Sequence, residues 1–348
     1  MTRALIGGVF GTGGGTDDLA DLRRLAEDIG ARSFDERIGH RGLPDEFDAT
    51  AWRHLQDAGL TRLISDPESG GGATESAVVL RALARHSVTV PLAETDVLAA
   101  WLAAEAGLEV PDEGPLTIAT GVAGSTTVTG VPYAGIGAAV VALRDGQALQ
   151  VAVTVPTAVS NGHNLGGEPR GTISVAAGQF VTVDGAADEL RRRGAWARCV
   201  QAVGALDAAV EFSVAHTRER EQFGRPLSAF QAVQHTLAAM AGEVERARAA
   251  TELAVAAVAD HGFASAQADY AVTVAKVVLG RVVPSVVTAA HQLHGAIGVT
   301  LEHRLWLTTM RARSWIEEFG DTAWYATRLG RLALAAGGNP WDLMVGAV

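Results

Sequence analysis

The sequence predicts an α+β protein in which a helical domain, a small β domain and a helical bundle follow one another. Three observations predict this order. Apolar residues recur three and four positions apart over residues 16–107, the period changes to two over 115–184, and the helical period returns from Ala187. The length of 348 residues suits several subdomains around a large core. We therefore divide the chain into domains of residues 1–114, 115–184 and 185–348.

Four segments predict the helices of the N-terminal domain. They read "DLADLRRLAEDIGARSF", "DEFDATAWRHLQDAGL", "ATESAVVLRALARHS" and "ETDVLAAWLAAEAGL". Thr16, Asp48 and Thr74 precede apolar periodic residues, and side chains of this kind cap helix N-termini. We therefore expect amphipathic helices that are separated by turns.

Short β-branched and alternating runs predict the middle domain. They read "LTIAT", "TTVTGV", "AAVVAL", "ALQVAVTV", "TISVAA" and "QFVTV", with Gly, Asn and Asp-Gly turn signals between them. Beyond them, long helices are predicted over 187–216, 229–260, 264–294 and 303–335, with a kink at Pro284 in the third. The wide apolar faces of these helices are typical of a packed bundle.

Charge and composition exclude several classes of protein. A net charge of -11 and a pI near 5.4 argue against a nucleic-acid surface, which needs clustered Lys and Arg. No apolar run reaches membrane-spanning length without Arg, Asp, His or Glu, and the N-terminus lacks the pattern of a signal peptide. The single cysteine, Cys199, excludes an internal disulfide and predicts a buried structural thiol. We therefore predict a cytoplasmic protein that binds neither nucleic acid nor membrane.

The N-terminal glycine loop suggests a dinucleotide site, but its spacing does not support one. An apolar run, the loop of "ALIGGVFGTGGG" and a predicted helix occur in the order of a nucleotide-binding unit. However, Gly11, Gly13 and Thr16 do not form G-x-G-x-x-G, and no second strand with a ribose-binding acid follows. We expect no dinucleotide site there.

Two segments of the predicted bundle form a motif pair. Residues 218–250 read "REREQFGRPLSAFQAVQHTLAAMAGEVERARAA", and residues 291–305 read "HQLHGAIGVTLEHRL". Together they resemble the acyl-CoA dehydrogenase family, whose R-x-x-F-G, downstream Gln and Q-x-x-G-G-x-G elements recur at this separation. The stretch "LQDAGLTRLISDPESGGG" is similar to an N-terminal loop of the same family. The resemblance covers nearly the whole chain and implies an acyl-CoA dehydrogenase-like fold with a C-terminal four-helix bundle.

The resemblance also implies FAD as cofactor, bound in extended form across a subunit interface. One side would be formed by Arg220, Gln222, Phe223, Phe230 and Gln231, and a neighbouring subunit would supply Gln292, Leu293, His294, Gly295 and Ala296. The residue types suit this task, because a guanidinium pairs with a pyrophosphate and glycines let the backbone approach a ligand. Ala296 departs from the second glycine of the family motif.

His291 and His294 stand three residues apart on one predicted helix face, which raises the question of a metal site. No acidic ligand occurs at H-E-x-x-H or E-x-x-H spacing, and no second pair of this kind is present. We therefore predict no metal and assign His294 to the core or to the edge of the flavin site.

The sequence lacks a carboxylate where the family keeps its catalytic base. Dehydrogenation of an acyl thioester needs a base that removes the α proton while the β hydrogen leaves as hydride to the flavin. By resemblance, the base position falls on Phe319 or, as in a minority of the family, on Gly194. The flavin loop of the middle domain, "IATGVAGSTTVTG", also lacks its acid, and Ala195 replaces a common arginine.

Glu317 and Glu318 are the carboxylates closest to the base position. A helix turns about 100° per residue, so at most one of the two can point inward after a small shift in register. The alternative is a solvated acidic helix face that also includes Asp321. We therefore assign no catalytic residue.

Several functions stay open. We favour a base-lacking subunit that joins a second acyl-CoA dehydrogenase chain in a heterotetramer and acts on an acyl-CoA in lipid or steroid side-chain degradation; a homo-oligomer is the other assembly. A flavin monooxygenase, which needs no glutamate, and a structural subunit without flavin are the alternatives. Trp306, Trp315 and Trp324 lie nine residues apart on the last apolar faces, and we expect most of them to pack internally.

Overall fold

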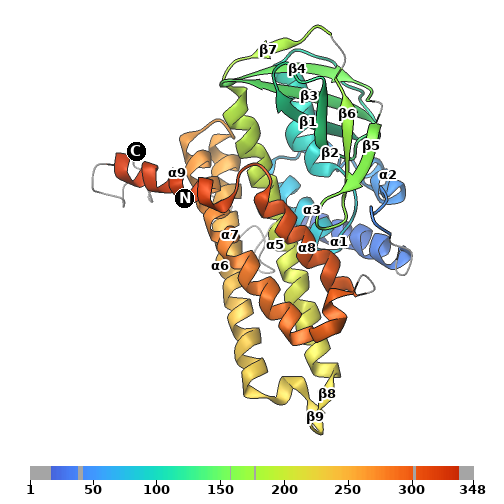
Figure 1. The fold of residues 1–348 in the computed structure, drawn as a ribbon, viewed down its shortest axis with the longest axis vertical. Helices are drawn as coiled ribbons and strands as arrows, with labels where there is room; N and C mark the ends of the chain where they lie inside the picture. Colours follow the sequence, from blue (N-terminus) through green and yellow to red (C-terminus); the bar gives the residue numbers. More distant parts are fainter. Residues whose placement is uncertain (1–16, 38–41, 157, 176–177, 301–302, 337–348) are drawn as a thin grey trace.

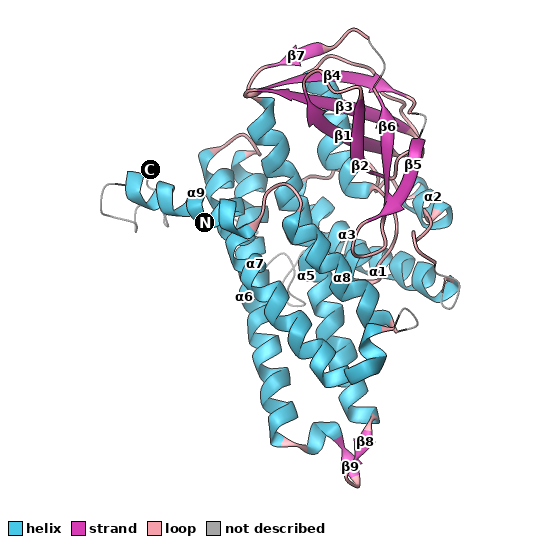
Figure 2. Cartoon of the chain, viewed as in Figure 1, coloured by secondary structure: helices cyan, strands magenta, loops and turns pink. Residues whose placement is uncertain are grey.

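The computed structural model describes residues 17–37, 42–156, 158–175, 178–300 and 303–336. A β domain lies at one end of the molecule, and long helices run from beneath it to the opposite tip (Figure 1). The N-terminal helices lie beside the upper part of the long helices. Figure 2 shows the strands gathered at one end and helices elsewhere, apart from a small hairpin at the tip. The observed order of helices, strands and helices is the one that the sequence predicts.

The N-terminal helices are α1 (Asp17–Glu36), α2 (Ala49–Asp57), η2 (Pro67–Ser69), α3 (Ala73–Arg85), the π-helix η3 (Ala93–Ala100) and α4 (Trp101–Glu105). The predicted cap Asp48 is confirmed, because its carboxylate accepts the Ala51 N–H at 2.9 Å. The predicted cap Thr74 is wrong: α3 begins at Ala73 after an extended Gly72, so Thr74 lies inside the helix. The predicted cap Thr16 lies outside the described residues.

The π-helix η3 is completely buried, including its carboxylates Glu94 and Asp96. Asp96 accepts the backbone N–H groups of Ile64 and Ser65 at 3.0 and 2.9 Å, so it holds the segment before η2. Glu94 pairs with Arg198 of the bundle at 2.6 Å. The fourth predicted helix is therefore η3 continued by α4, and it carries buried charges that need partners.

The strands are β1 (Leu116–Val122), β2 (Thr127–Pro132), β3 (Ala138–Asp145), β4 (Ala148–Thr154), β5 (Ala158–His163), β6 (Pro169–Ser174) and β7 (Val181–Val183). They form a sheet of order β1-β3-β4-β7 and a second of order β2-β6-β5. Residues such as Val128, Val141 and Ile173 pack in a core of the β domain. β5 is not predicted from the sequence, since "AVSNGH" is polar; its pairing with β6 defines it as a strand.

The C-terminal elements are α5 (Ala186–Glu219), the hairpin β8 (Glu221–Gln222) and β9 (Arg225–Pro226), η4 (Leu227–Ala229), α6 (Gln231–His261), α7 (Ala266–His294), η5 (Gly295–Val299), α8 (Arg304–Glu317) and α9 (Thr322–Ala335). α5 packs against α3, α6, α7 and α8 and is thus central to the bundle. α7 contains Pro284 within its span, and the kink there stays a prediction. Cys199 on α5 is buried, as predicted.

The single helix predicted over 303–335 is wrong, because the chain turns between α8 and α9. Phe319 and Gly320 have positive φ angles of 57° and 108°, which end the α-helical path. Asp321 then caps α9 by accepting the Trp324 N–H at 2.7 Å. The turn separates the tryptophans: Trp315 is 1% exposed, whereas Trp324 is 39% exposed.

One segment, Ala266–Val299, is long and apolar enough to cross a membrane by length and composition. Buried residues make up 61% of its apolar window, and α7 within it packs against α5, α6, α8 and α9. A mostly buried core helix passes the same test, so the finding is only weak evidence for a membrane span.

Candidate functional site

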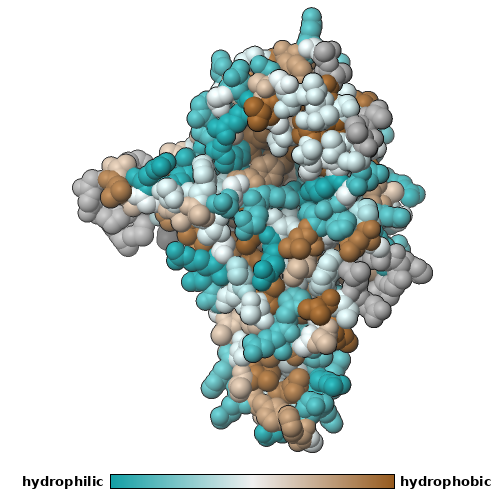
Figure 3. Space-filling model, viewed as in Figure 1, coloured by the Kyte–Doolittle hydropathy of each residue, from teal (hydrophilic) through white to brown (hydrophobic). Residues whose placement is uncertain are grey.

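A groove with a volume of about 380 Å³ lies between the first sheet, the start of α5 and the α8–α9 turn. Figure 3 shows a hollow with brown and tan atoms between the β domain and the bundle. Its lining residues are Thr120, Gly121, Val122, Ala142, Arg144, Leu149, Ala187, Leu190, Arg191, Phe319 and Gly320. These described residues include two arginines and no carboxylate, so the groove suits a ligand with an apolar chain and an anionic end.

Phe319 and Gly194, the two positions where resemblance would place a base, lie against each other. A Cβ atom added at Gly194 would collide with the ring of Phe319. The ring thus fills the space that a larger side chain at either position would need. Gly194 and Phe319, which are 125 residues apart in the sequence, therefore share one space in the fold. Neither residue supplies a carboxylate to that space.

Buried donors fix the backbone around Phe319. Lys276 on α7 is 1% exposed, and its ammonium donates to the carbonyls of Ile316 and Glu318 at 2.6 and 2.9 Å. The Tyr325 hydroxyl donates to the carbonyl of Phe319 at 3.1 Å. Burial lowers the pKa of Lys276 and raises the pKa of Tyr325. The turn is held by side chains from α7 and α9 rather than by its own sequence.

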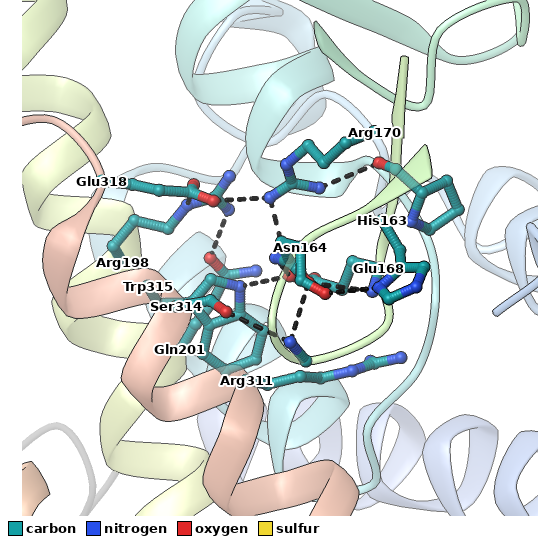
Figure 4. Close-up of polar contacts among 12 residues, drawn as sticks. His163, Asn164, Glu168, Arg170, Arg198, Gln201, Arg311, Ser314, Trp315 and Glu318 are labelled. Carbon is teal, nitrogen blue, oxygen red and sulfur yellow. Dashed lines mark hydrogen bonds and ion pairs between the residues drawn. The ribbon is translucent and has the colours of Figure 1, made fainter. Parts of the chain in front are cut away.

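Glu318 is part of a buried ion-pair cluster. Its carboxylate contacts Arg170 of β6 at 2.6 Å and Arg198 of α5 at 2.7 Å (Figure 4). Arg198 also pairs with Glu94 at 2.6 Å. Burial alone would raise the pKa of Glu318, but the guanidiniums of Arg198 and Arg170 outweigh it and lower the pKa to about 2. A carboxylate so weakly basic and so fully engaged is unsuited to proton abstraction.

As expected, only one of the two glutamates, Glu318, points inward, but the structure contradicts both a base role for it and an acidic helix face. Glu318 is ionised and paired, so it is neither a base nor a solvated charge. Glu317 is exposed, and Asp321 caps the next helix instead of extending an acidic face. The reason is the turn at Phe319, which ends the helical periodicity on which both interpretations depended.

Replacing Gly194 with Ala is expected to lower the free energy of unfolding by about 1–3 kcal/mol, because the added methyl group collides with Phe319. The matched control is Gly242→Ala on α6, where an added Cβ meets nothing within 4 Å and about 0.5–1 kcal/mol of stabilisation is expected. Urea unfolding of both variants measures the difference. Equal stabilisation by both substitutions would show that Phe319 does not fill this space.

The predicted cofactor residues of the first segment lie at the far tip of the bundle. Arg220 ends α5, and Gln222 and Phe223 lie in the β8–β9 hairpin. Phe223 has a φ of 55° and is 91% exposed; its ring lies 6.2 Å from that of Phe230, just before Gln231 at the start of α6. An exposed aromatic ring beside an exposed guanidinium fits the planar and anionic parts of a dinucleotide.

The second segment ends α7 and continues into η5. Gln292, Gly295 and Ala296 are exposed, Leu293 is partly buried, and His294 is 5% exposed. Gly295 has a φ of 63°, and an added Cβ there would meet nothing within 4 Å. His294 stacks on His216 of α5, with ring centroids 4.4 Å apart, so the end of α7 lies against the last turn of α5, just before Arg220. The role of the two predicted segments in cofactor binding stays a prediction.

The groove and the predicted cofactor residues lie at opposite ends of α5. Gly194 and Arg220 are separated by about 40 Å of helix at 1.5 Å per residue. One small ligand of this chain cannot contact both.

The family model described as acyl-CoA dehydrogenase, C-terminal domain, matches residues 188–323. This match covers the C-terminal domain, and together with the fold and the relatives described next it supports the resemblance of the chain to the acyl-CoA dehydrogenase family, which comprises oxidoreductases acting on CH–CH bonds. The resemblance predicted from the motifs is thereby confirmed.

Among curated proteins, the chain is similar to the acyl-CoA dehydrogenase IpdE2 of Mycolicibacterium smegmatis. The two are 28% identical over 273 residues, which are 76% of this chain and 82% of that protein. The IpdE2 protein of Mycobacterium tuberculosis is 29% identical over 283 residues, with 76% and 81% coverage.

Among solved structures, the chain resembles a subunit in the ChsE4-ChsE5 complex from Mycobacterium tuberculosis. The TM-score is 0.77, with 24% identity over 92% of this chain and 98% of that one. A structure titled as a Tcur3481-Tcur3483 steroid ACAD variant gives the same TM-score with 25% identity and the same coverage. The predicted fold class is confirmed by these likenesses.

Proposed function

We propose that this chain is the base-lacking subunit of an FAD-linked heteromeric acyl-CoA dehydrogenase. Two features of the groove carry the proposal. Phe319 fills the space beside Gly194, and no described residue that lines the groove is a carboxylate. The adjacent carboxylate, Glu318, is half-buried and engaged by two arginines. The partner chain supplies the base in its own groove.

A bound FAD would supply the acceptor for the β hydrogen, which leaves as hydride. In this chain, Arg220 would pair with the pyrophosphate, Phe223 would cover a planar ring, and Gln222 would donate hydrogen bonds. The exposure of these side chains supports this assignment, since none of them packs in the hydrophobic core. Gln292 to Ala296 would meet the FAD that is held mainly by the neighbouring chain.

The groove orients what enters it without moving a proton. Val122, Leu149 and Leu190 offer apolar walls, and Arg144 and Arg191 offer positive charge. Arg191 is partly committed, because it pairs with Asp188 at 2.6 Å and lies over the Trp324 ring at 4.8 Å. We infer a thioester with an anionic carrier as the ligand class, and we place the protein in the cytoplasm.

The two-chain solved structures support a second acyl-CoA dehydrogenase chain as the partner. One neighbour is titled as a complex of two subunits, and another as a steroid ACAD. We extend this to a heterotetramer of the present chain and a catalytic chain, acting on a lipid or steroid side-chain thioester. We expect the groove of the partner chain, rather than this one, to determine which acyl group is accepted.

The test is to purify the chain alone and together with co-expressed acyl-CoA dehydrogenase chains encoded beside it. We expect bound flavin and acyl-CoA turnover only in the complex, with turnover abolished when the partner's base is changed to Gln. Turnover by the isolated chain that Glu318→Gln abolishes would contradict the proposal. Oxygen-dependent use of a reductant would favour a monooxygenase, and no flavin in any complex would favour a structural subunit.

A further inference from the structure

Three imidazole rings lie together where α5, α7 and α8 meet. His216 lies in the last turn of α5, His294 ends α7, and His303 caps α8. The ring centroids of His216 and His294 are 4.4 Å apart with planes at 19°, and those of His294 and His303 are 4.9 Å apart at 67°. We call these three residues the imidazole cluster. It joins the helix ends that carry Arg220 and Gln292 to Ala296.

The hydrogen bonds of the imidazole cluster fit neutral rings. His294 donates from Nδ1 to the Ala290 carbonyl at 2.8 Å, and His303 accepts the Leu305 N–H on Nδ1 at 3.1 Å. The Nε2 atom of His294 is buried and has no hydrogen-bond partner among the described residues. A proton added there would gain no acceptor in the closed structure, so a charged His294 needs contact with water.

The charges that face the imidazole cluster are mostly positive. They come from Arg220 and Glu219 on α5, His291 on α7, and Arg304 on α8, with Arg313 of α8 facing His291. Glu219 is the one carboxylate among these described groups. A proton on one ring therefore meets repulsion from the other rings and from arginines, with little compensation.

We propose that the imidazole cluster is an acid-sensitive latch, which holds the end of α5 against α7 and α8 while its rings are neutral and releases them when it is protonated. Release would separate the Arg220 to Phe223 segment from the Gln292 to Ala296 segment. The latch depends on contacts within this chain alone. It goes beyond the proposed function and does not rest on flavin, substrate or partner.

The direction of the pH dependence follows from the burial of the rings. Burial, followed by neighbouring positive charges, lowers the pKa of His216 and of His303 from 6.5. Burial also lowers the pKa of His294, to about 4. The opened form binds protons at the ordinary pKa, so the latch is fully closed above pH 6.5 and weakens as the pH falls from 6.5 toward 4.

The test is amide hydrogen exchange of the full chain at pH 7.5 and pH 5, corrected for the intrinsic pH dependence of exchange. We expect the opening equilibrium of amides near residues 213–223, 290–300 and 303–305 to rise at least about tenfold at pH 5, since one pKa unit corresponds to a tenfold change. The middle of α6 serves as internal reference. No local rise in the wild-type chain would overturn the latch.

The variant that tests the cause is His216→Phe combined with His303→Asn. Phenylalanine keeps the ring stack, and asparagine keeps an acceptor for the Leu305 N–H. At pH 5 this variant should open at least about three times less than the wild type, and His235→Asn on the exposed surface of α6 should behave as wild type. Equal acid opening in the double variant would also overturn the latch. Circular dichroism at pH 7.5 establishes that the variants are folded.

Discussion

Replacing Glu318 with Gln is expected to lower the free energy of unfolding by about 3 kcal/mol, because removing one partner of a buried ion pair leaves the other charge uncompensated. Glu318 bridges Arg170 and Arg198, and Arg198 is 2% exposed. The amide keeps the shape of the side chain and removes its charge. Urea unfolding at pH 7.5, followed by circular dichroism, measures the loss.

Glu317→Gln is the matched control, since the adjacent carboxylate is exposed and about 0.5 kcal/mol or less is expected. The pH dependence gives a second check. The pKa of Glu318 is lowered from 4.5 to about 2, so its contribution is complete above pH 4.5 and is lost as the pH falls toward 2. The difference between wild type and variant should therefore shrink over that range. Equal losses for Glu317→Gln and Glu318→Gln would contradict the ion-pair cluster.

Replacing Phe319 with Glu is expected to give the isolated chain a proton-transfer activity that the wild type lacks. Phe319 lines the groove, so the new carboxylate would face a bound thioester. It would take the α proton, and the resulting enolate would take a deuteron from solvent, with no change in oxidation state. General-base catalysis contributes roughly 10²–10⁴-fold, so we expect exchange at least about 10²-fold above wild type. NMR of butyryl-CoA in deuterium oxide measures it.

Phe319→Gln is the control for this substitution, because it has the size of Glu without the charge. Arg198 lies 5.8 Å from the Phe319 ring, but its charge is already paired with Glu94 and Glu318. The new carboxylate therefore should not form a further ion pair that would prevent it from accepting a proton. Equal exchange in the Glu and Gln variants would show that the groove does not hold an acyl thioester in this way.

The fold could be predicted from the sequence because its periods are long and distinct. The helices α5, α6 and α7 carry apolar residues at helical spacing over about thirty residues each, and their predicted spans agree with the structure within about three residues. The strand β5 was missed because its residues are polar and its identity depends on a partner strand. Thr74 was a wrong cap because a glycine can begin a helix as well.

The candidate site could be predicted only in part. The motif pair indicated Arg220 and Phe223 at a helix end, where the structure has them. The role of Glu318 was missed, since its partners are distant in sequence. One signal was present: Arg198 interrupts the apolar stretch "AWARCVQAV", and a buried arginine in a core helix needs a carboxylate. The carboxylate that pairs with Arg198 is determined by tertiary packing, which the sequence pattern does not reveal.

The contacts that hold the α8–α9 turn also bear on the order of folding. Glu318 contacts Arg198 and Arg170, which are 120 and 148 positions away, and Lys276, which holds its carbonyl, is 42 positions away. Contacts of such high sequence separation form only after the chain has closed large loops. We therefore expect the α8–α9 turn to take its final shape after α5, α7 and β6 have come together, so that its conformation would indicate docking of the β domain on the bundle.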